Sequence, residues 1–383
     1  MARLSTLVIG GGIGGLSLAR ELANRGLPCT VLEKAPRIAP VGAGIIMNPN
    51  AMGVLERNGL ADGLRANSWP YLARETCDRN GRLLARRDYR PLYDAGKLPV
   101  GALVHRAHLH DALFGGIAAG VVRLNSFVKE IKISSKSVRA TTDSGESFEA
   151  DVLVGADGIH SPVRAQLFGE VKPRYMGYRS HRMVVDNVAG VKDFIELLGQ
   201  GQRIGLVPIS RERIYIWTTF NSPHGPAPVI ESADAFRAMF RQFTDPRVVQ
   251  LFAQLRLPDE IISTAVEELE HESWVQGRAA LLGDAVHAMT PNIGQGAGMA
   301  MEDAAVLAEE IASASNMEIS LEKYFQRRKP RVDTVVRVSR GVGEDGQKSG
   351  IIGCWLRNRR VERAGRDTAK TQSDLERLLA FHG

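Results

Sequence analysis

The chain has 383 residues, of which 44% are hydrophobic and 24% charged, with a formal net charge of +6. These proportions are typical of a globular protein and exclude a fibrous or disordered chain. No apolar run approaches the roughly 18 residues of a membrane-spanning helix. The three cysteines lack the spacing of a zinc site or a disulfide framework. We therefore expect no metal site and no integral membrane association. We also expect a cytoplasmic location, because the N-terminal sequence leaves no room for a signal peptide.

The first thirty-four residues predict a strand, a turn, a helix and a second strand. Residues 3–9 are a short apolar run that ends at glycine, which is typical of a buried parallel strand. From Ile13 onward, apolar residues recur at helical spacing until Gly26, a common residue at a helix C-terminus. The stretch "PCTVLEK" then reads as the second strand. This order predicts a βαβ unit.

The turn of this unit carries the pattern G-x-G-x-x-G, formed by Gly10, Gly12 and Gly15, with Gly14 also inside it. Glycines there allow a tight turn, a close approach of a pyrophosphate, and close packing of the helix on the strand. Glu33 ends the next strand, where a carboxylate accepts hydrogen bonds from an adenosine ribose; Lys34 follows it. A carboxylate at this place favours FAD or NAD over NADP.

The rest of the chain alternates between α/β-patterned and strand-rich pieces. Around residues 71–100, and again over 173–267, short strands dominate, whereas the segment from residue 268 onward predicts a strand followed by long helices. We therefore predict a discontinuous nucleotide-binding domain with an inserted β-sheet domain. The predicted nucleotide-binding domain comprises residues 1–70, 101–172 and 268–340, the substrate domain residues 71–100 and 173–267, and the C-terminal helical segment residues 341–383.

Two further motifs follow apolar strands. The first is Asp157-Gly158, which alone is a common turn. The second is "LLGDAVHAMTPNIGQGAG", in which a strand ends before Asp284 and a glycine-rich run leads into a helix with free N-terminal amides. Its candidate binding residues are Asp284, Pro291, Gly294, Gln295, Gly296, Ala297 and Gly298.

In this order, the three motifs resemble those of the class A flavoprotein monooxygenases, the para-hydroxybenzoate hydroxylase-like group. The resemblance covers roughly residues 3–340 and implies an α/β fold whose Rossmann-like domain binds a single FAD with both glycine-rich loops. It implies that Asp284 binds the ribitol and that the helix start at 294–298 faces the flavin. It further implies that Arg106 lies along the phosphates and ribitol, that Val128 contacts the adenine through its backbone, and that His287 is structural.

The strand-rich insert contains candidate substrate residues. Arg203 and Tyr215 lie on two successive strands joined by a turn, and a hairpin can bring both to one face. This pattern resembles that of FAD-dependent urate hydroxylases and of alkylquinolone hydroxylases. The resemblance implies that Arg203 holds an enolate-like oxygen and that Tyr215 orients the ring. We predict His181, Met183 and Trp217 as pocket residues; for Met183 and Trp217, sheet core is the open alternative.

The resemblance implies that NADH or NADPH reduces the flavin, and that O₂ then gives a C4a-hydroperoxyflavin that hydroxylates a small aromatic substrate. Inactivation of a bulky antibiotic-like compound, and a non-catalytic flavin-binding protein, are the alternatives. The segment from Gln326 to Arg366 holds twelve Lys and Arg against four Asp and Glu. It lacks the interleaved aromatic residues of a nucleic-acid site. We expect a solvated helical surface there. For the stretch "SGIIGCWLRNRRVERAGRD" within and just after it, we expect a helix that packs onto the FAD domain, with membrane-surface contact or a dimer surface as alternatives. We expect the protein to be a monomer or a homodimer.

Overall fold

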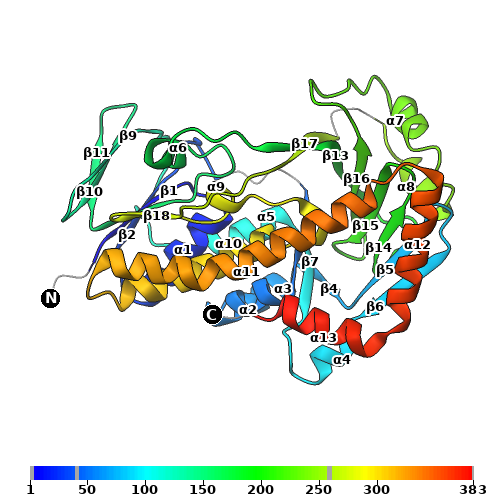
Figure 1. Ribbon diagram of the computed structural model, residues 1–383, viewed down its shortest axis with the longest axis horizontal. Coiled ribbons are helices and arrows are strands. Elements are labelled where there is room, and N and C mark those ends of the chain that lie inside the picture. The colour runs from blue at the N-terminus through cyan, green and yellow to red at the C-terminus, as the bar shows by residue number, and fades with distance from the viewer. Residues whose placement is uncertain (1–3, 39–42, 257–260, 382–383) are drawn as a thin grey trace.

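A computed structural model describes residues 4–38, 43–256 and 261–381 (Figure 1). One half of the molecule is built on a six-stranded sheet whose strands all run parallel except β18. In sheet order the strands are β18 (Val275–Gln276), β19 (Ala279–Leu281), β12 (Val152–Gly155), β1 (Thr6–Ile9), β2 (Cys29–Leu32) and β8 (Val122–Arg123). The strand, helix and strand expected at the N-terminus are β1, α1 (Ile13–Asn24) and β2, so the predicted βαβ unit is confirmed.

The six-stranded sheet shares one hydrophobic core with helices from both ends of the chain. Helix α1 packs against α10 (Gly296–Ala312), and α10 packs against α11 (Met317–Gly346). The same core takes in the antiparallel strands β9 (Val128–Ile133), β10 (Val138–Thr142) and β11 (Ser147–Ala150). Smaller elements nearby are α2 (Pro49–Arg57), α3 (Ala61–Arg65), α5 (Arg106–Phe114), α6 (Pro162–Phe168) and α9 (Asp284–His287).

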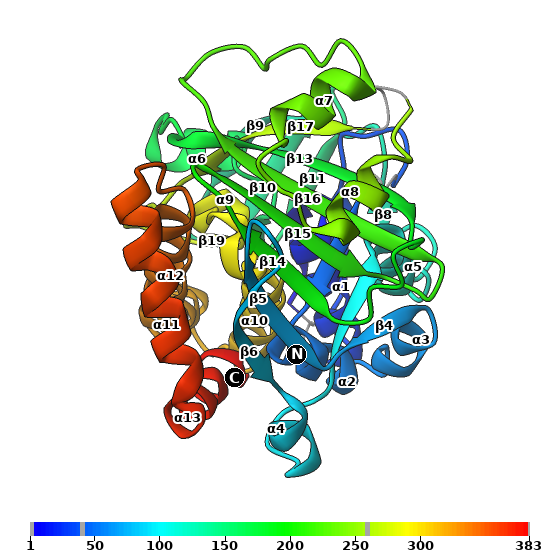
Figure 2. The ribbon, with the colours of Figure 1, turned by 90° about the vertical axis from the view of Figure 1, so that its right-hand side faces the viewer.

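A seven-stranded sheet forms the other half of the molecule (Figure 2). Its order is β17 (Ile262–Glu268), β13 (Arg174–Asp186), β16 (Arg213–Asn221), β15 (Gln202–Pro208), β14 (Phe194–Leu198), β5 (Ala73–Asp78) and β6 (Leu83–Asp88). One face packs against α7 (Ala233–Met239) and α8 (Pro246–Phe252) in an apolar core. Because side chains alternate along a strand, every second residue points to the opposite face.

A small antiparallel sheet lies between the two halves and consists of β3 (Gly44–Met47), β7 (Gly101–His105) and β4 (Ser68–Tyr71). The short helix α4 (Arg90–Asp94) precedes β7 in the chain (Figure 1). Helix α11 is 30 residues long and runs from beside the six-stranded sheet to the seven-stranded sheet (Figure 1). After it come α12 (Ile351–Arg366) and α13 (Thr368–Leu379). The predicted fold class, including the C-terminal helices, is confirmed; the domain boundaries stay a prediction.

Within the described ranges, no helix combines the length and the apolar character needed to cross a bilayer.

Candidate active site

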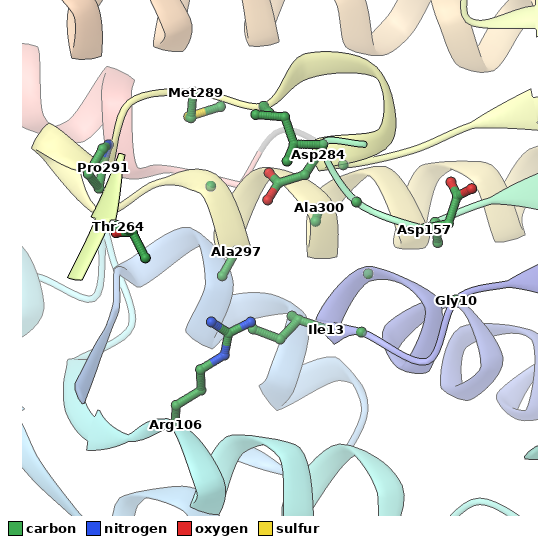
Figure 3. A pocket seen from close by; sticks show the side chains of 18 of the residues that line it. Gly10, Ile13, Arg106, Asp157, Thr264, Asp284, Met289, Pro291, Ala297 and Ala300 are labelled. Atoms are coloured by element: carbon green, nitrogen blue, oxygen red, sulfur yellow. The ribbon is translucent and has the colours of Figure 1, made fainter. Parts of the chain in front are cut away.

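A cavity of about 880 Å³ lies between the two halves and extends from the glycine turn after β1 to the inner face of the seven-stranded sheet (Figure 3). It brings both glycine-rich loops to one space, although almost 280 residues separate them in the chain. Most of the predicted site residues line it: Gly10, Gly12, Gly14, Glu33, Lys34, Arg106, Val128, Asp157, Arg203, Tyr215, Trp217, Asp284, Pro291, Gly294, Gly296 and Ala297.

The first glycine turn has the shape that a polyphosphate requires. Gly10 has φ +108°, and a Cβ there would lie 2.4 Å from the carbonyl oxygen of Ala156. A Cβ at Gly12 would meet no atom within 4 Å, so the backbone is open to the cavity where α1 begins. The first amides of a helix have no partner within the helix and attract anions. Gly15 does not line the cavity; its Cβ would lie 2.0 Å from the oxygen of Gly10, so it serves close packing.

Glu33 is held beside this turn by two backbone amides. Its Oε2 accepts a hydrogen bond from the Gly11 amide at 2.6 Å, and its Oε1 accepts one from the Ala35 amide at 2.8 Å. Each carboxylate oxygen has two lone pairs, so both remain able to accept a hydroxyl. The carboxylate therefore fits an adenosine ribose.

The second loop places a carboxylate opposite an arginine. Asp284 follows Gly283, which has φ +60°, and its side chain is open to the cavity and faces Arg106 in Figure 3. Desolvation by the surrounding protein raises the pKa of Asp284, and His287 and Arg106 partly offset this. Among the described residues, no side chain or backbone group hydrogen-bonds the Arg106 guanidinium. Asp284 and Arg106 thus present a free acceptor and a free donor to a polar chain between them.

The start of α10 is fixed by an amide pair. Asn50 Nδ2 donates to Gln295 Oε1 at 2.9 Å, and Gln295 Nε2 donates to Asn50 Oδ1 at 3.1 Å. Gln295 is fully buried and does not line the cavity, and a Cβ at Gly298 would lie 2.8 Å from Asn50 Nδ2. The side chain of Gln295 and the Cα of Gly298 therefore position the loop, whereas Gly294, Gly296 and Ala297 border the cavity.

The amide pair is continued by an ion-pair network towards the C-terminus. Asn50 Nδ2 also donates to Glu302 at 2.8 Å, and Arg331 binds the same carboxylate at 2.6 and 2.8 Å. Arg331 donates in turn to the carbonyl oxygens of Leu378 and Ala380, at 3.2 and 2.9 Å. The last helix is thereby connected to the cofactor loop.

Asp157 lines the cavity, but its carboxylate is engaged by its own loop. Its oxygens accept hydrogen bonds from the Ser161 hydroxyl and from the Val163 amide, the latter at 2.9 Å. In the same loop, Arg164 donates to the carbonyl oxygen of Ala285 at 2.6 Å, next to Asp284. The Asp-Gly motif therefore supports the geometry of the second loop.

A buried network accounts for His287. Its Nε2 lies 2.6 Å from Asp303, which also accepts from the Gly283 amide at 3.0 Å and from Arg328 at 2.8 Å. Burial alone would raise the pKa of Asp303, but His287 and Arg328 lower it to about 2. His287 does not border the cavity.

At the far end of the cavity, Arg203 is nearly fully buried and held on several sides. Its Nη1 lies 3.2 Å from Glu196, its Nε donates to Gln347 at 3.1 Å, and its Nη2 donates to Asn292. Its guanidinium carbon also lies 5.6 Å from the ring centre of Trp217. Glu196, Asn292 and Gln347 were not among the predicted residues.

Tyr215 and Arg203 lie on the same face of the β15–β16 hairpin, as the sequence predicted. In the strand register, Arg203 lies opposite Thr219 and Tyr215 lies opposite Val207. Trp217 therefore lies on the same face of β16, between Tyr215 and the position opposite Arg203. Burial raises the pKa of Tyr215 to about 12, although Arg182 and Arg106 act to lower it. The hydroxyl therefore stays protonated at neutral pH and can donate a hydrogen bond.

Glycines make room for the two aromatic rings. A Cβ at Gly44 would lie 2.3 Å from the Tyr215 ring, and a Cβ at Gly205 would lie 2.0 Å from the indole of Trp217. Backbone close to an aromatic face is possible here only because these positions lack a side chain.

His181 and Met183 do not line the cavity, so their prediction as pocket residues is wrong. Both point to the opposite face of the sheet, where Met183 joins the apolar core and the His181 ring lies 4.8 Å from Phe220 and 5.6 Å from Phe236. The residue between them, Arg182, lines the cavity instead.

Arg182 was not predicted as a pocket residue, because the sequence does not show which face of its strand borders the cavity. Its Nη2 donates to Thr264 Oγ1 at 2.7 Å, whereas its buried Nε has no partner in the described part of the chain. It pairs with Trp217 across β13 and β16, and this pairing is the signal that could have located it. After desolvation, Arg182 is the main cause that lowers the pKa of Arg106. Two cations therefore share this wall of the cavity.

A family model described as an FAD binding domain matches residues 3–339. The chain belongs to this FAD-binding family. It is 33% identical over 382 residues to the aurachin C monooxygenase/isomerase of Stigmatella aurantiaca, covering 97% of this chain and 98% of the relative. It is 31% identical to the 2-heptyl-3-hydroxy-4(1H)-quinolone synthase of Pseudomonas aeruginosa, covering 93% of each. The structure of Klebsiella pneumoniae HpxO with FAD and uric acid superposes with a TM-score of 0.87 at 27% identity, covering 98% of this chain and 97% of that one.

These similarities confirm the resemblance to class A flavoprotein monooxygenases and confirm FAD as the cofactor, with NAD(P)H as the co-substrate typical of the family. The protein is a flavin-dependent oxidoreductase of the hydroxylase type. Four features of the cavity fit the parts of that cofactor. The open turn at Gly12 fits the phosphates and the Glu33 carboxylate fits the adenosine. The Asp284–Arg106 pair fits the ribitol, and the free start of α10 fits the flavin ring.

Proposed function

We propose that the protein hydroxylates a planar, electron-rich heteroaromatic compound that carries an ionisable hydroxyl or enol oxygen attached to the ring. The observation that carries the proposal is the row of Arg203, Trp217 and Tyr215 on the sheet face that closes the FAD cavity. FAD, when bound and reduced by NAD(P)H, supplies the activation of O₂. The chain's own residues bind and orient the substrate and keep water out.

Arg203 acts on the charge of the substrate. A cation beside a hydroxyl or enol oxygen favours its ionised form, which is the more nucleophilic form of an aromatic ring. Glu196, Asn292 and Gln347 hold the guanidinium in place, so little reorganisation is needed when an oxyanion arrives.

Tyr215 and Trp217 orient the ring. The protonated Tyr215 hydroxyl can donate to a second substrate heteroatom, because its pKa of about 12 keeps it neutral. The Trp217 indole offers a flat apolar wall, and aromatic pairs stack in offset or edge-to-face arrangements. A planar ring with oxygens at two edges meets these three groups.

The compounds named for two relatives support a nitrogen heterocycle as the substrate. The Pseudomonas aeruginosa relative is named for a heptyl-substituted hydroxyquinolone, and the HpxO structure contains uric acid. Both are bicyclic nitrogen heterocycles with oxygen atoms attached to the rings. We propose an alkyl quinolone as the first candidate substrate and urate as the second.

The test is NADH and NADPH oxidation by the FAD-loaded protein, with and without alkyl quinolones, urate and hydroxybenzoates, followed by mass spectrometry. A compound that accelerates oxidation and gains one oxygen atom supports the proposal, and Arg203→Gln should abolish this gain while leaving FAD bound. Peroxide as the sole product with every heteroaromatic compound would overturn it.

A further inference from the structure

Helix α12 carries a patch of apolar side chains on its outward surface. Ile351, Ile352, Trp355 and Leu356 are 76%, 75%, 56% and 48% exposed. They are four of the twelve large apolar side chains that are exposed within the described ranges, and they lie within six positions of one another. They occupy two adjacent rows of the helix, because residues four apart in sequence share one face.

Arginines continue the same two rows. Arg359, Arg360, Arg363 and Arg366 are all exposed, and the guanidinium of Arg359 lies 5.5 Å from the ring centre of Trp355. The helix holds five arginines and a single acidic residue, Glu362. The outer surface is therefore apolar at the N-terminal end and cationic over the rest.

The opposite face of α12 is held firmly on the protein. Arg357 is nearly fully buried and donates to the carbonyl oxygens of Gly199 and Gly346 at 2.9 and 3.2 Å. Cys354 is buried beside it, and Gly365 approaches Ala85 of β6 so closely that a Cβ would lie 2.7 Å away. The four apolar side chains are thus held on the exposed face of α12. The helix itself lies at the edge of the molecule in Figures 1 and 2.

We infer that α12 docks the protein on an anionic phospholipid surface. An interfacial helix combines Trp, Leu and Ile on the face that enters the headgroup region with basic residues that meet anionic lipids. Arg359 and Arg360 pair with Glu362 and Asp345 at 3.6 and 3.1 Å, whereas Arg363 and Arg366 form no ion pair within the described ranges and supply the charge complementarity. Each basic residue near such a surface strengthens binding roughly fivefold. The surface occupant is therefore a bilayer rich in phosphatidylglycerol or a similar lipid.

The docked helix adjoins the substrate end of the cavity. Gln347, four residues before Ile351, accepts hydrogen bonds from Arg203 at 3.1 Å and from Thr219 at 2.8 Å, and donates to Asn221 at 2.9 Å. The surface on which α12 docks is thereby close in the chain to the residues that hold Arg203. A substrate dissolved in the bilayer would enter near the place where it reacts.

The experiment is flotation of the full-length, FAD-loaded protein with vesicles of phosphatidylcholine alone and of phosphatidylcholine with phosphatidylglycerol. We expect binding only to the anionic vesicles and its loss at high salt, since screening weakens exposed charges. The variant Ile351→Ser/Ile352→Ser/Trp355→Ser and the variant Arg363→Gln/Arg366→Gln should each weaken binding by at least about tenfold. Val229→Ser, at a side chain 85% exposed in another segment, is the matched control and should bind like the wild type.

Bound FAD and the near-ultraviolet circular dichroism spectrum verify that each variant is folded. Vesicle binding is measured without turnover, so the inference about α12 can be tested even if the proposed hydroxylase function is wrong. Absence of binding, equal binding to neutral vesicles, or wild-type binding by both α12 variants would overturn the inference. So would a wild-type dimer that becomes monomeric in the serine variant without any vesicle binding, because the patch would then be a subunit interface.

Discussion

The Nη1 atom of Arg203 lies 3.2 Å from Oε1 of Glu196, and both side chains are almost completely buried. Arg74 pairs with the other oxygen of the same carboxylate. Burial alone would raise the pKa of Glu196, but Arg74 and Arg203 lower it, so the carboxylate stays ionised. The single negative charge of Glu196 is thus shared by two arginines. The group of three keeps a net positive charge that a substrate oxyanion can neutralise.

We expect Glu196→Gln to lower the free energy of unfolding by about 3–5 kcal/mol, because it leaves two buried guanidinium groups without their counterion. Urea denaturation of the two proteins gives this difference. Substrate-dependent oxidation should also slow, since Arg203 loses a positioning partner. Glu149→Gln, which removes a surface pair with Arg139, is the control and should change stability by less than about 1 kcal/mol. Equal losses in both variants would contradict the prediction.

His181→Phe should stabilise the protein at mildly acidic pH. Burial, with a smaller effect of Arg179, lowers the pKa of His181 to about 4, whereas the unfolded chain titrates near 6.5. Between these values the unfolded state binds the extra proton, so wild-type stability falls as the pH falls through this window. The loss is on the order of 3 kcal/mol, and thermal unfolding from neutral pH to pH 4 should show a shallower decline in the variant.

The same variant tests the placement of His181. A phenylalanine fits among Phe220, Phe236 and Phe240, and the cavity is on the other face of the sheet. Turnover should therefore be retained. A large rise in KM would instead place His181 at the substrate.

Gly205→Ala should impair substrate binding without affecting FAD. Its Cβ would lie 2.0 Å from the Trp217 indole, which must then move away from the substrate wall. We expect a higher KM and more peroxide per NAD(P)H consumed, measured by coupling assays, with an unchanged FAD dissociation constant. Gly341→Ala is the matched control, because a Cβ there meets nothing within 4 Å.

Arg106→Met should weaken FAD binding. The guanidinium faces Asp284 across the cavity, and its lost charge-assisted hydrogen bond corresponds to roughly 10- to 150-fold in affinity. Titration of the apoprotein with FAD, followed by flavin fluorescence, measures this change. Arg139→Met, on strand β10 of the β9–β11 sheet, is the control and should leave FAD affinity unchanged. A similar loss of affinity in that variant would point to overall charge as the cause.

The parts of the site that come from continuous motifs were predicted well, because local sequence determines a turn. Gly10, Gly12 and Glu33 needed only the βαβ unit. Within the second motif, however, the sequence could not separate the residues that border the cavity from Gln295 and Gly298, which pack against Asn50.

The substrate face was predicted in part, and the error has a simple cause. A strand with polar residues on both sides, such as "SHRM", does not reveal its buried face, and a shift by one residue exchanges the two sets. Arg182 was therefore not predicted to line the cavity, and His181 and Met183 were predicted to line it although they face the other side of the sheet. Asn292 and Gln347 were not predicted because only the tertiary fold brings them to Arg203: Asn292 lies in the short 3-10 turn Pro291–Ile293, and Gln347 directly follows the end of α11.

The connection from Arg331 to the last helix concerns the order in which the site is completed during synthesis. Domains assemble from the N-terminus as the chain emerges, and the first glycine turn is made early. The carbonyl groups of Leu378 and Ala380, which hold Arg331 and through it Glu302 and Asn50, are made some 80 residues after the loop that they support. A ribosome-bound chain that has not yet reached Leu378 therefore lacks these partners of Arg331, and we expect stable loading of FAD only towards the end of translation.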